Sequence, residues 1–285
     1  MWRPVPSRPS SYDRRPTTLR QSPAGCPSRI SQPIAYRALM RQQDPVREVS
    51  LWGEDHVEFG EIAVSSLDEA VAIAISKGRH PKGYPTLDSN EDAVLAAASE
   101  RSTVLAVVDG HRGFDAARAA LRAVAASVGD LLSAATDPRS RIEAVHRRAI
   151  AGVRDAIDAA SAERSMSKTT LGIVLVEGGT VTVGGFGDSD VKLVEPRRSR
   201  SLWRPAPFLG PDARPEDAWF ATTPLRSSAW VVAGTDGVFD FLGRDWAEKL
   251  ESFTGGSADE FARSTIETAF DGGAGDHSAL AVIRP

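Results

Sequence analysis

Residues 104–113 read VLAVVDGHRG, so five apolar residues lead directly into Asp109, Gly110 and His111. A short apolar run that is bounded by an Asp-Gly dipeptide is typical of a buried strand that ends in a turn. The same order returns in AWVVAGTDG at 229–237, where a second apolar run leads to Asp236 and Gly237. Two strand ends of this kind in one chain indicate that the carboxylates have a function.

The pattern outside these two stretches predicts both helices and strands. Apolar spacings of three and four predict amphipathic helices at 114–135 and 139–160, and a late helix is expected at 257–273. His146 lies among arginines on the second helix, so we expect it on the surface. Strands, with a Gly-Gly turn at 178–179, are predicted at 169–179, 180–196, 229–237 and 277–285. Because the strands come in runs, the pattern favours an α+β fold with antiparallel sheets over a doubly wound parallel sheet.

The composition is that of an ordinary globular protein. The chain has 285 residues, of which 41% are hydrophobic and 25% charged, with a formal net charge of −4. This charge gives no indication of a nucleic-acid partner, and no apolar run approaches the ~18–20 residues that span a bilayer. Cys26 is the one cysteine, which excludes an intrachain disulfide and fits a reducing compartment. We therefore expect a cytoplasmic monomer with no membrane or nucleic-acid partner.

The first 50 residues differ from the rest. They contain nine arginines and three acidic residues, are rich in Pro and Ser, and have no apolar periodicity. They lack the apolar segment of a secretory signal, and their prolines argue against an amphipathic transit peptide. We predict that residues 1–49 form a disordered Pro/Arg/Ser-rich extension and that residues 50–285 form one folded domain.

Acidic residues gather at the predicted strand ends and turns. Carboxylates that are brought together repel one another and lose hydration, so such a cluster requires a cation. Oxygen ligands without a cluster of Cys or His favour Mg²⁺, Mn²⁺ or Ca²⁺ over zinc. A glycine after the aspartate has no Cβ, which lets its backbone carbonyl approach a metal. The candidates are Glu91, Asp92, Asp109, Asp236 and Asp276, whereas Asp188 fits a turn-capping role better than a ligand role.

Five motifs, in order, resemble those of the type 2C protein phosphatases, the metal-dependent serine/threonine phosphatases (PPM family). The resemblance covers roughly residues 55–285. It implies a four-layer α-β-β-α sandwich in which helices flank two antiparallel sheets, with two Mg²⁺ or Mn²⁺ ions at one end. It also implies a signalling enzyme that acts on phosphorylated protein substrates. The motifs are NEDAV, VLAVVDGHRGFDAARAA, TTLGIVLVEGGTVTVGGFGDSDVKLV, AWVVAGTDGVFDFLG and GDHSALAVI.

The resemblance also assigns roles to individual residues. Asp92 belongs with Glu91 to an acidic pair that acts on one metal directly or through water, and His111 corresponds to a proposed general acid. The implied reaction is hydrolysis of phosphoserine or phosphothreonine in one step by a metal-bridging water, without a phosphoenzyme. The metal ligands that the resemblance implies are Asp109, Gly110, Asp236, Asp276 and Glu91.

The sequence departs from the family pattern where phosphate would be bound. Leu87 stands where the family usually has an arginine, and Lys82 is our candidate phosphate-binding substitute, with Arg79 nearby. No aspartate for a third metal has a clear match. The alternatives are therefore a catalytically weak or inactive domain that serves as a regulatory binding module, and a divergent two-metal hydrolase of small phosphoesters. Further departures are Arg112, Asp190 and His277.

Overall fold

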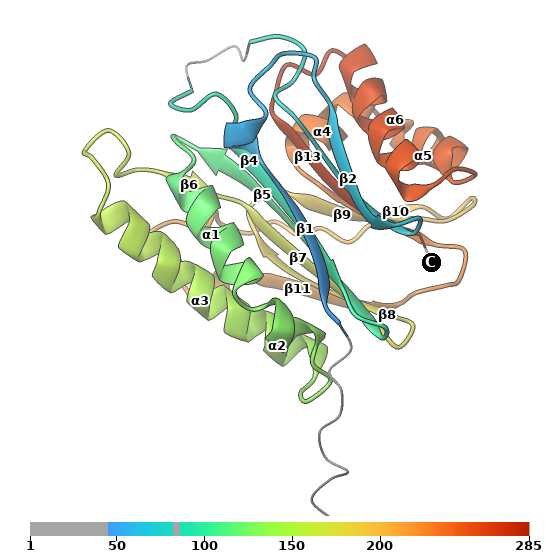
Figure 1. Ribbon diagram of the computed structural model, residues 1–285, viewed down its shortest axis with the longest axis horizontal. Helices are drawn as coiled ribbons and strands as arrows, with labels where there is room; N and C mark the ends of the chain where they lie inside the picture. The colour runs from blue at the N-terminus through green and yellow to red at the C-terminus, as the bar shows by residue number, and fades with distance from the viewer. Residues whose placement is uncertain (1–44, 82–85, 285) are drawn as a thin grey trace, which may run out of the picture. The chain divides into compact units, whose positions relative to one another are not determined.

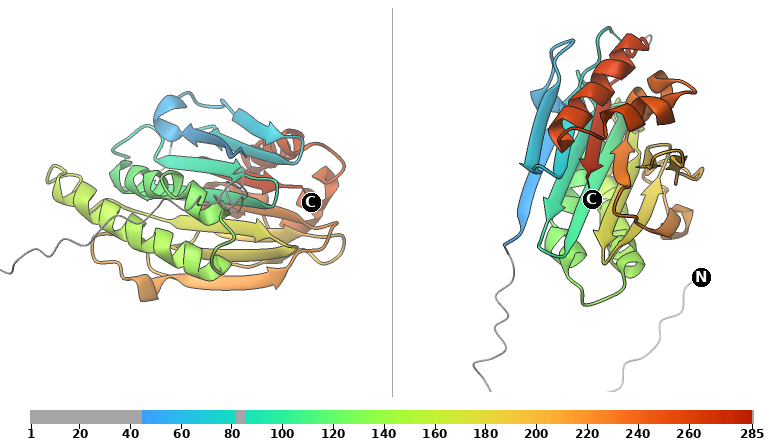
Figure 2. Two further views of the ribbon diagram at one scale, coloured as in Figure 1. Left: turned by 60° about the horizontal axis from the view of Figure 1, so that its bottom comes forward. Right: turned by 90° about the vertical axis from the view of Figure 1, so that its right-hand side faces the viewer.

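The computed structural model describes residues 45–81 and 86–284 as four layers (Figure 1). Two antiparallel sheets face each other, one group of helices covers the outer face of each sheet, and three apolar clusters fill the spaces between the layers. In both views of Figure 2 the helices before residue 160, in green, stay apart from those after residue 235, in orange to red. The expected α+β fold, a four-layer α-β-β-α sandwich, is confirmed.

The first sheet has the strand order β1-β4-β5-β7-β8-β11, and the short strand β6 pairs with the end of β5. Neighbouring strands in this sheet are antiparallel throughout. Its strands are β1 (Arg47–Trp52), β4 (Asp92–Ala98), β5 (Ser102–His111), β6 (Lys168–Thr169), β7 (Leu171–Glu177), β8 (Thr180–Phe186) and β11 (Trp219–Pro224).

The second sheet has the order β10-β9-β12-β13-β3-β2 and is also antiparallel. At one edge of this sheet, β2 and β3 form a hairpin that the sequence pattern did not predict. Its strands are β2 (Ala63–Asp68), β3 (Val71–Ser76), β9 (Asp190–Val194), β10 (Arg200–Ser201), β12 (Trp230–Gly234) and β13 (Ser278–Ile283).

Helices α1 to α3 pack on the first sheet and α4 to α6 on the second. Two 3-10 turns, η2 (Gly53–Asp55) and η3 (Pro215–Asp217), lie in connections. No helix in the described parts of the chain combines the length and apolar character that a membrane crossing requires. The helices are α1 (Asp115–Ala125), α2 (Val128–Leu132), α3 (Pro138–Asp158), α4 (Asp236–Leu242), α5 (Trp246–Phe253) and α6 (Ala258–Asp271).

The opening apolar run is continuous because β5 is buried on both faces. Val104, Ala106 and Val108 pack against the helices, whereas Leu105 and Val107 pack against the second sheet. Side chains alternate along a strand, so Asp109 continues the row that faces the second sheet. The strand thus directs this carboxylate into the end of the space between the two sheets.

Two of the predicted elements have wrong boundaries. The helix expected at 114–135 is broken into α1 and α2 at Ser127, whose φ of −111° and ψ of 4° are not helical and whose hydroxyl donates to the Ala123 carbonyl at 2.7 Å. The strand expected at 180–196 is two strands in different sheets, since the chain bends at Gly187, whose φ is 75°. The domain start expected at residue 50 stays a prediction, and the first described strand begins at Arg47.

Candidate metal centre

The centre of the site is a pair of aspartates that face each other across two strands. Asp92 at the start of β4 is the direct cross-strand partner of Asp109 near the end of β5, and both are buried. Opposed residues of an antiparallel pair project from the same face, where like charges destabilise the sheet. A cation between or beside the two carboxylates relieves this repulsion, so the arrangement fits a metal.

Gly110 brings a third carboxyl group close to this pair. Its backbone N–H donates to the Glu91 carbonyl at 3.0 Å, and a Cβ at position 110 would lie 2.7 Å from the same oxygen. The Glu91 carboxylate accepts hydrogen bonds from the N–H groups of Gly113 at 2.8 Å and Asp88 at 3.3 Å. A glycine is therefore required because the segment that carries Glu91 passes against the end of β5.

The second Asp-Gly dipeptide, Asp236-Gly237, also lets the backbone of another acidic segment approach closely, here at the end of the second sheet. A Cβ at Gly237 would lie 1.7 Å from the His277 carbonyl oxygen, and the Ser278 hydroxyl donates to the Gly237 carbonyl at 2.9 Å. The start of α4, with Asp236, consequently packs against the loop that carries Asp276. In both dipeptides, the space that the missing Cβ leaves is filled by backbone of another acidic segment.

Two hydrogen bonds join the acidic segments of the two sheets. The Thr235 hydroxyl donates to an Asp92 carboxylate oxygen at 2.9 Å and accepts from the Ala279 N–H at 3.0 Å. The Glu91 N–H donates to Nδ1 of the buried His277 at 3.0 Å, which defines that nitrogen as unprotonated. The ends of β4, β5, β12 and β13 are therefore fixed to one another.

The electrostatics of Asp236 fit a cation site. Burial, followed by the neighbouring carboxylates of Asp276, Asp188 and Asp240, raises its pKa to about 6. The largest contributions to this shift come from burial and from other carboxylates. A carboxyl group held among other carboxyl groups gains its full charge when a divalent cation binds.

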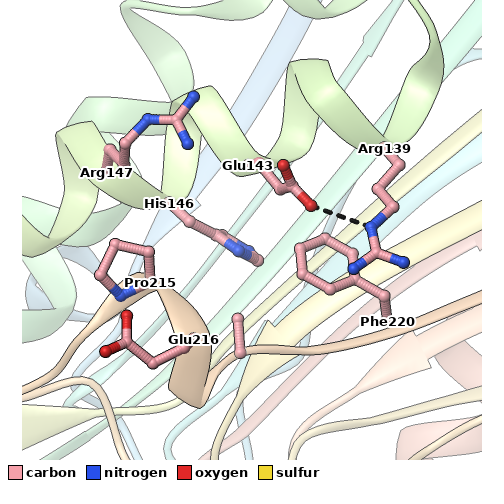
Figure 3. Close-up of a pocket in the computed structure, with 8 residues that line it drawn as sticks. Arg139, Glu143, His146, Arg147, Pro215, Glu216 and Phe220 are labelled. Atoms are coloured by element: carbon pink, nitrogen blue, oxygen red, sulfur yellow. Dashed lines mark hydrogen bonds and ion pairs between the residues drawn. The ribbon is translucent and has the colours of Figure 1, made fainter.

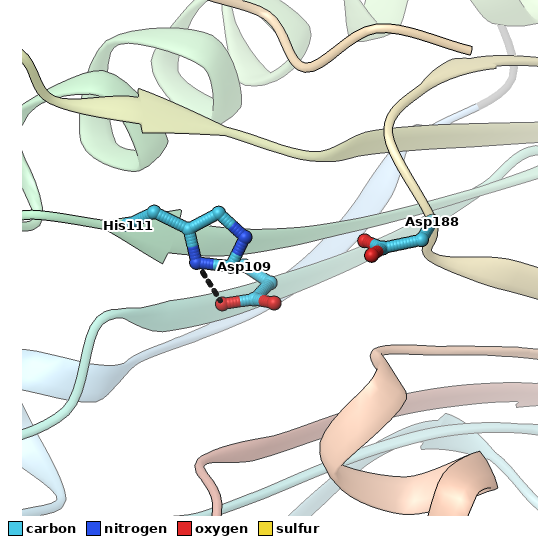
Figure 4. A group of neighbouring side chains, drawn as sticks. All are labelled: Asp109, His111 and Asp188. Carbon is cyan, nitrogen blue, oxygen red and sulfur yellow. Dashed lines mark ion pairs between the residues drawn. The ribbon is translucent and has the colours of Figure 1, made fainter. Parts of the chain in front are cut away.

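Asp188 is a candidate ligand, although the sequence pattern favoured a turn-capping role for it. Ligand atoms of Asp109, His111 and Asp188 lie within 4.8 Å of one another, and Figure 4 shows Asp188 reaching toward Asp109 from a separate segment. The His111 Nδ1 lies 3.7 Å from an Asp109 carboxylate oxygen. Asp188 follows Gly187, where the chain crosses from β8 to β9, and this Gly-Asp step was the available signal for its position.

Of the residues that we considered for phosphate binding, the structure describes Arg79 and Leu87 but not Lys82. Lys82 falls outside the described residues. Leu87 is 37% exposed, and Arg79 pairs with Asp271 at 3.6 Å and lies over the Phe270 ring, on α6. The described structure therefore assigns neither Leu87 nor Arg79 to a phosphate contact at the metal centre.

A cavity of about 440 Å³ lies away from these carboxylates, between α3 and the segment that leads into β11 (Figure 3). His146, expected on the surface, is buried there, and burial lowers its pKa to about 3. Neither ring nitrogen has a hydrogen-bond partner among the described residues. The ring contacts Phe186 and Phe220 instead, at centroid distances of 5.0 and 5.4 Å. None of the predicted site residues lines this cavity.

No family model matches the chain, and no curated protein matches it in sequence. Solved structures do match in fold. The serine/threonine phosphatase PstP/Ppp of Mycobacterium tuberculosis is 19% identical, with a TM-score of 0.59 over 75% of this chain and 97% of that one. The PstP catalytic domain in complex with two manganese ions is 18% identical, with a TM-score of 0.60 over 78% and 99%. RsbX in complex with magnesium is 16% identical, with a TM-score of 0.53 over 78% and 98%.

These likenesses concern the fold. The chain has the sandwich of the type 2C serine/threonine phosphatases, so the resemblance read from its motifs is confirmed at this level. The match covers nearly the whole length of each of these structures, whereas identity is below 20% in all three.

Proposed function

We propose that the chain is a Mg²⁺- or Mn²⁺-dependent phosphatase of phosphoserine and phosphothreonine in proteins. The observation that carries the proposal is the meeting of acidic segments from both sheets at one end of the sandwich. Asp92 and Asp109 are direct cross-strand partners there, and the pKa of Asp236 is raised to about 6 by burial and by surrounding carboxylates. The fold of solved metal-containing phosphatases supports the same reading.

In this proposal the residues of the chain divide into metal-binding and proton-transferring groups. Two divalent ions bound at this end would supply a nucleophilic water at neutral pH and neutralise the phosphoryl oxygens. Asp92 anchors the first sheet to the second through Thr235 and completes the acidic pair with Glu91. The residues that would hold the ions are Asp109, Gly110 through its carbonyl, Asp236, Asp276 and Glu91.

His111 is suited to protonate the leaving alcohol. Its side chain is 24% exposed, so a substrate oxygen can reach the ring, and an Asp109 carboxylate oxygen lies 3.7 Å from Nδ1. Its ring also packs edge-on against Phe208 at a centroid distance of 4.7 Å, which limits its rotation. This role belongs to the proposal, as does the protein nature of the substrate.

The test is hydrolysis of p-nitrophenyl phosphate and of a phosphothreonine peptide by the full chain, with Mn²⁺ and with EDTA. We expect turnover of both substrates with Mn²⁺ and none after exhaustive chelation. Asp155→Ala, which removes an exposed carboxylate from α3, serves as a charge-matched control that should retain activity. Activity that survives chelation would contradict the metal-dependent mechanism.

The alternative of a regulatory module is favoured by one feature, the exposed Leu87 at the position of the expected arginine. This module would bind a phosphothreonine peptide without hydrolysing it at any metal concentration. Turnover of p-nitrophenyl phosphate without any turnover of peptides would instead favour a hydrolase of small phosphoesters. The hydrolysis assay therefore separates the two enzymatic readings, and peptide binding measured on a chain without turnover identifies the regulatory module.

A further inference from the structure

We propose that Lys168 binds the phosphoryl group of the substrate, in place of the arginine that position 87 lacks. The inference rests on the proposed phosphatase function and names the residue that gives it affinity for phosphate. Leu87 offers no charge. A fixed cation beside the metal ligands would add to the attraction that bound metal ions exert on a phosphate dianion.

The strand register puts Lys168 beside the residues of the metal centre. In the β5–β6 pair, His111 is the direct partner of Lys168, and Gly110 is the partner of Thr169. Direct partners in an antiparallel pair project from the same face, and side chains two residues apart do so as well. The side chains of Lys168, His111 and Asp109 therefore lie on one face at the end of β5.

The backbone that carries Lys168 is tied to Asp109. The Thr170 N–H and the Thr169 hydroxyl both donate to the Asp109 carbonyl, at 2.9 and 2.8 Å. The Asp109 N–H in turn donates to the Thr170 hydroxyl at 2.9 Å. These three bonds lie within two residues of Lys168, so its Cα is held in a fixed position relative to the carboxylate.

Phe208 gathers His111 and Lys168 into one patch. The ammonium nitrogen of Lys168 lies 4.1 Å from the centroid of the Phe208 ring, and the His111 ring meets the same ring edge-on. A cation over an aromatic face keeps its N–H donors available for an anion. Phe208 thus holds the half-buried lysine next to the proposed general acid without neutralising it.

Two cations near this end of the sandwich have carboxylate partners, whereas Lys168 has none among the described residues. Arg164 pairs with Asp88, and Lys192 pairs with Asp190 at 2.6 Å. Across the described residues, no carboxylate lies within ion-pair distance of Lys168, whose contact is with the Phe208 ring. Its charge is consequently free to attract a phosphate.

Arg112 is the competing candidate because it follows His111 directly. It is exposed, and its guanidinium contacts the Met166 sulfur, a weak acceptor, at 3.4 Å. Its φ is 62°, a left-handed conformation that suits glycine, so Arg112→Gly removes the charge and relieves backbone strain at once. Lys168 is the stronger candidate because strand pairing and Phe208 fix its position.

The experiment compares the full-length, Mn²⁺-loaded chain with Lys168→Met, Lys168→Arg, Arg112→Gly and Arg101→Met. Arg101 is exposed just before the opposite end of β5, so its variant is the charge-matched control. We expect Lys168→Met to raise KM for a phosphothreonine peptide at least ~10-fold, with kcat within about threefold, because a charged hydrogen bond to phosphate is lost. Lys168→Arg should restore most of the affinity, and Arg101→Met should match the parent chain.

Two further readouts separate this inference from the proposed function. Mn²⁺ affinity should be the same in Lys168→Met and in the parent chain, whereas affinity for inorganic phosphate, measured calorimetrically with Mn²⁺, should fall ~10-fold. Lysine-dependent phosphate binding without any hydrolysis would reject the phosphatase and retain the phosphate site. Unchanged KM and phosphate affinity in Lys168→Met would overturn the inference, as would a loss that appears only in Arg112→Gly. Absence of both hydrolysis and phosphate binding in the parent chain would overturn both proposals.

Discussion

Two groups of aspartates near the end of β5 have opposite electrostatic surroundings. Asp88 receives two hydrogen bonds from the Arg164 guanidinium, at 2.7 and 2.8 Å, and this arginine also reaches Asp115 at 3.0 Å. The hydrogen bonds from Arg164 hold the pKa of Asp88 below its usual value. Asp236 is surrounded by carboxylates instead, and burial with their repulsion raises its pKa to about 6.

The difference separates a structural carboxylate from a ligand. The Arg164 group, defined here as Arg164, Asp88 and Asp115, brings its own cation and fixes the turn after β5, because Asp88 also accepts from the Phe114 N–H at 2.7 Å. The Asp236 group, defined here as Asp236, Asp276, Asp188 and Asp240, is a cluster of carboxylates whose mutual repulsion favours binding of a cation from solution. Four predictions test this contrast, in order of expected effect.

The largest effect concerns the ligands themselves. Asp109→Ala and, separately, Asp236→Ala should each lower turnover of a phosphothreonine peptide at least ~10²-fold, since each removes an oxygen that holds a metal. Steady-state kinetics with Mn²⁺, together with circular dichroism to confirm folding, provide the measurement. A rate near that of the parent chain, with metal occupancy verified, would refute the assignment.

The second prediction concerns stability. Removing the charge of Asp236 should stabilise the metal-free protein, whereas it should lower activity. The folded-state pKa of Asp236 is raised to about 6 from 3.8, so its contribution to stability is fully present below pH 3.8 and is lost as pH rises through 6. Asp236→Asn should therefore stabilise the metal-free protein at pH 7 by about 2–3 kcal/mol. Denaturant unfolding in EDTA at pH 5 and pH 7 measures this gain.

Metal addition is the matched control for that prediction. Mn²⁺ should raise the melting temperature of the parent chain at pH 7, because a ligand that binds only the folded state stabilises it. Asp236→Asn should show a smaller rise. If EDTA and Mn²⁺ give the same melting temperature in the parent chain, the carboxylates do not form a cation site.

The third effect tests the Arg164 group. Arg164→Met should lower the free energy of unfolding by about 1–2 kcal/mol, because Asp88 and Asp115 lose their charged partner. The lowered pKa of Asp88 means that its contribution is present above pH 3.8 and is lost on acidification, the reverse of Asp236. Urea unfolding between pH 3 and pH 7 should therefore show the parent and variant converging at low pH. A constant difference would indicate that Arg164 acts by packing alone.

The smallest effect is expected from the N-terminal segment. Deletion of residues 1–44 should leave the melting temperature and the rate on p-nitrophenyl phosphate unchanged, because that segment is basic, proline-rich and aperiodic. The deletion stops before Arg47, since β1 begins there and pairs along β4. Loss of stability or rate would show that the segment belongs to the fold.

The sequence by itself determined the class of the fold and most of the acidic positions. The apolar run at 104–108 has no polar interruption because both faces of β5 are buried. The sequence therefore shows this burial as a continuous run of apolar residues. Asp109 and Asp236 were identified because each follows an apolar run and precedes a glycine. Periodicity and turn chemistry are local properties, so one chain segment carries them.

Tertiary structure alone decided which side chains meet. Asp188 became a candidate ligand because the chain changes sheets at Gly187, and Lys168 because β6 pairs with β5 beside His111. The buried position of His146 depends on contacts with Phe186 and Phe220, which lie far from it in sequence. Strand register and inter-sheet packing are properties of distant pairs, and no local pattern in a single sequence specifies the partner.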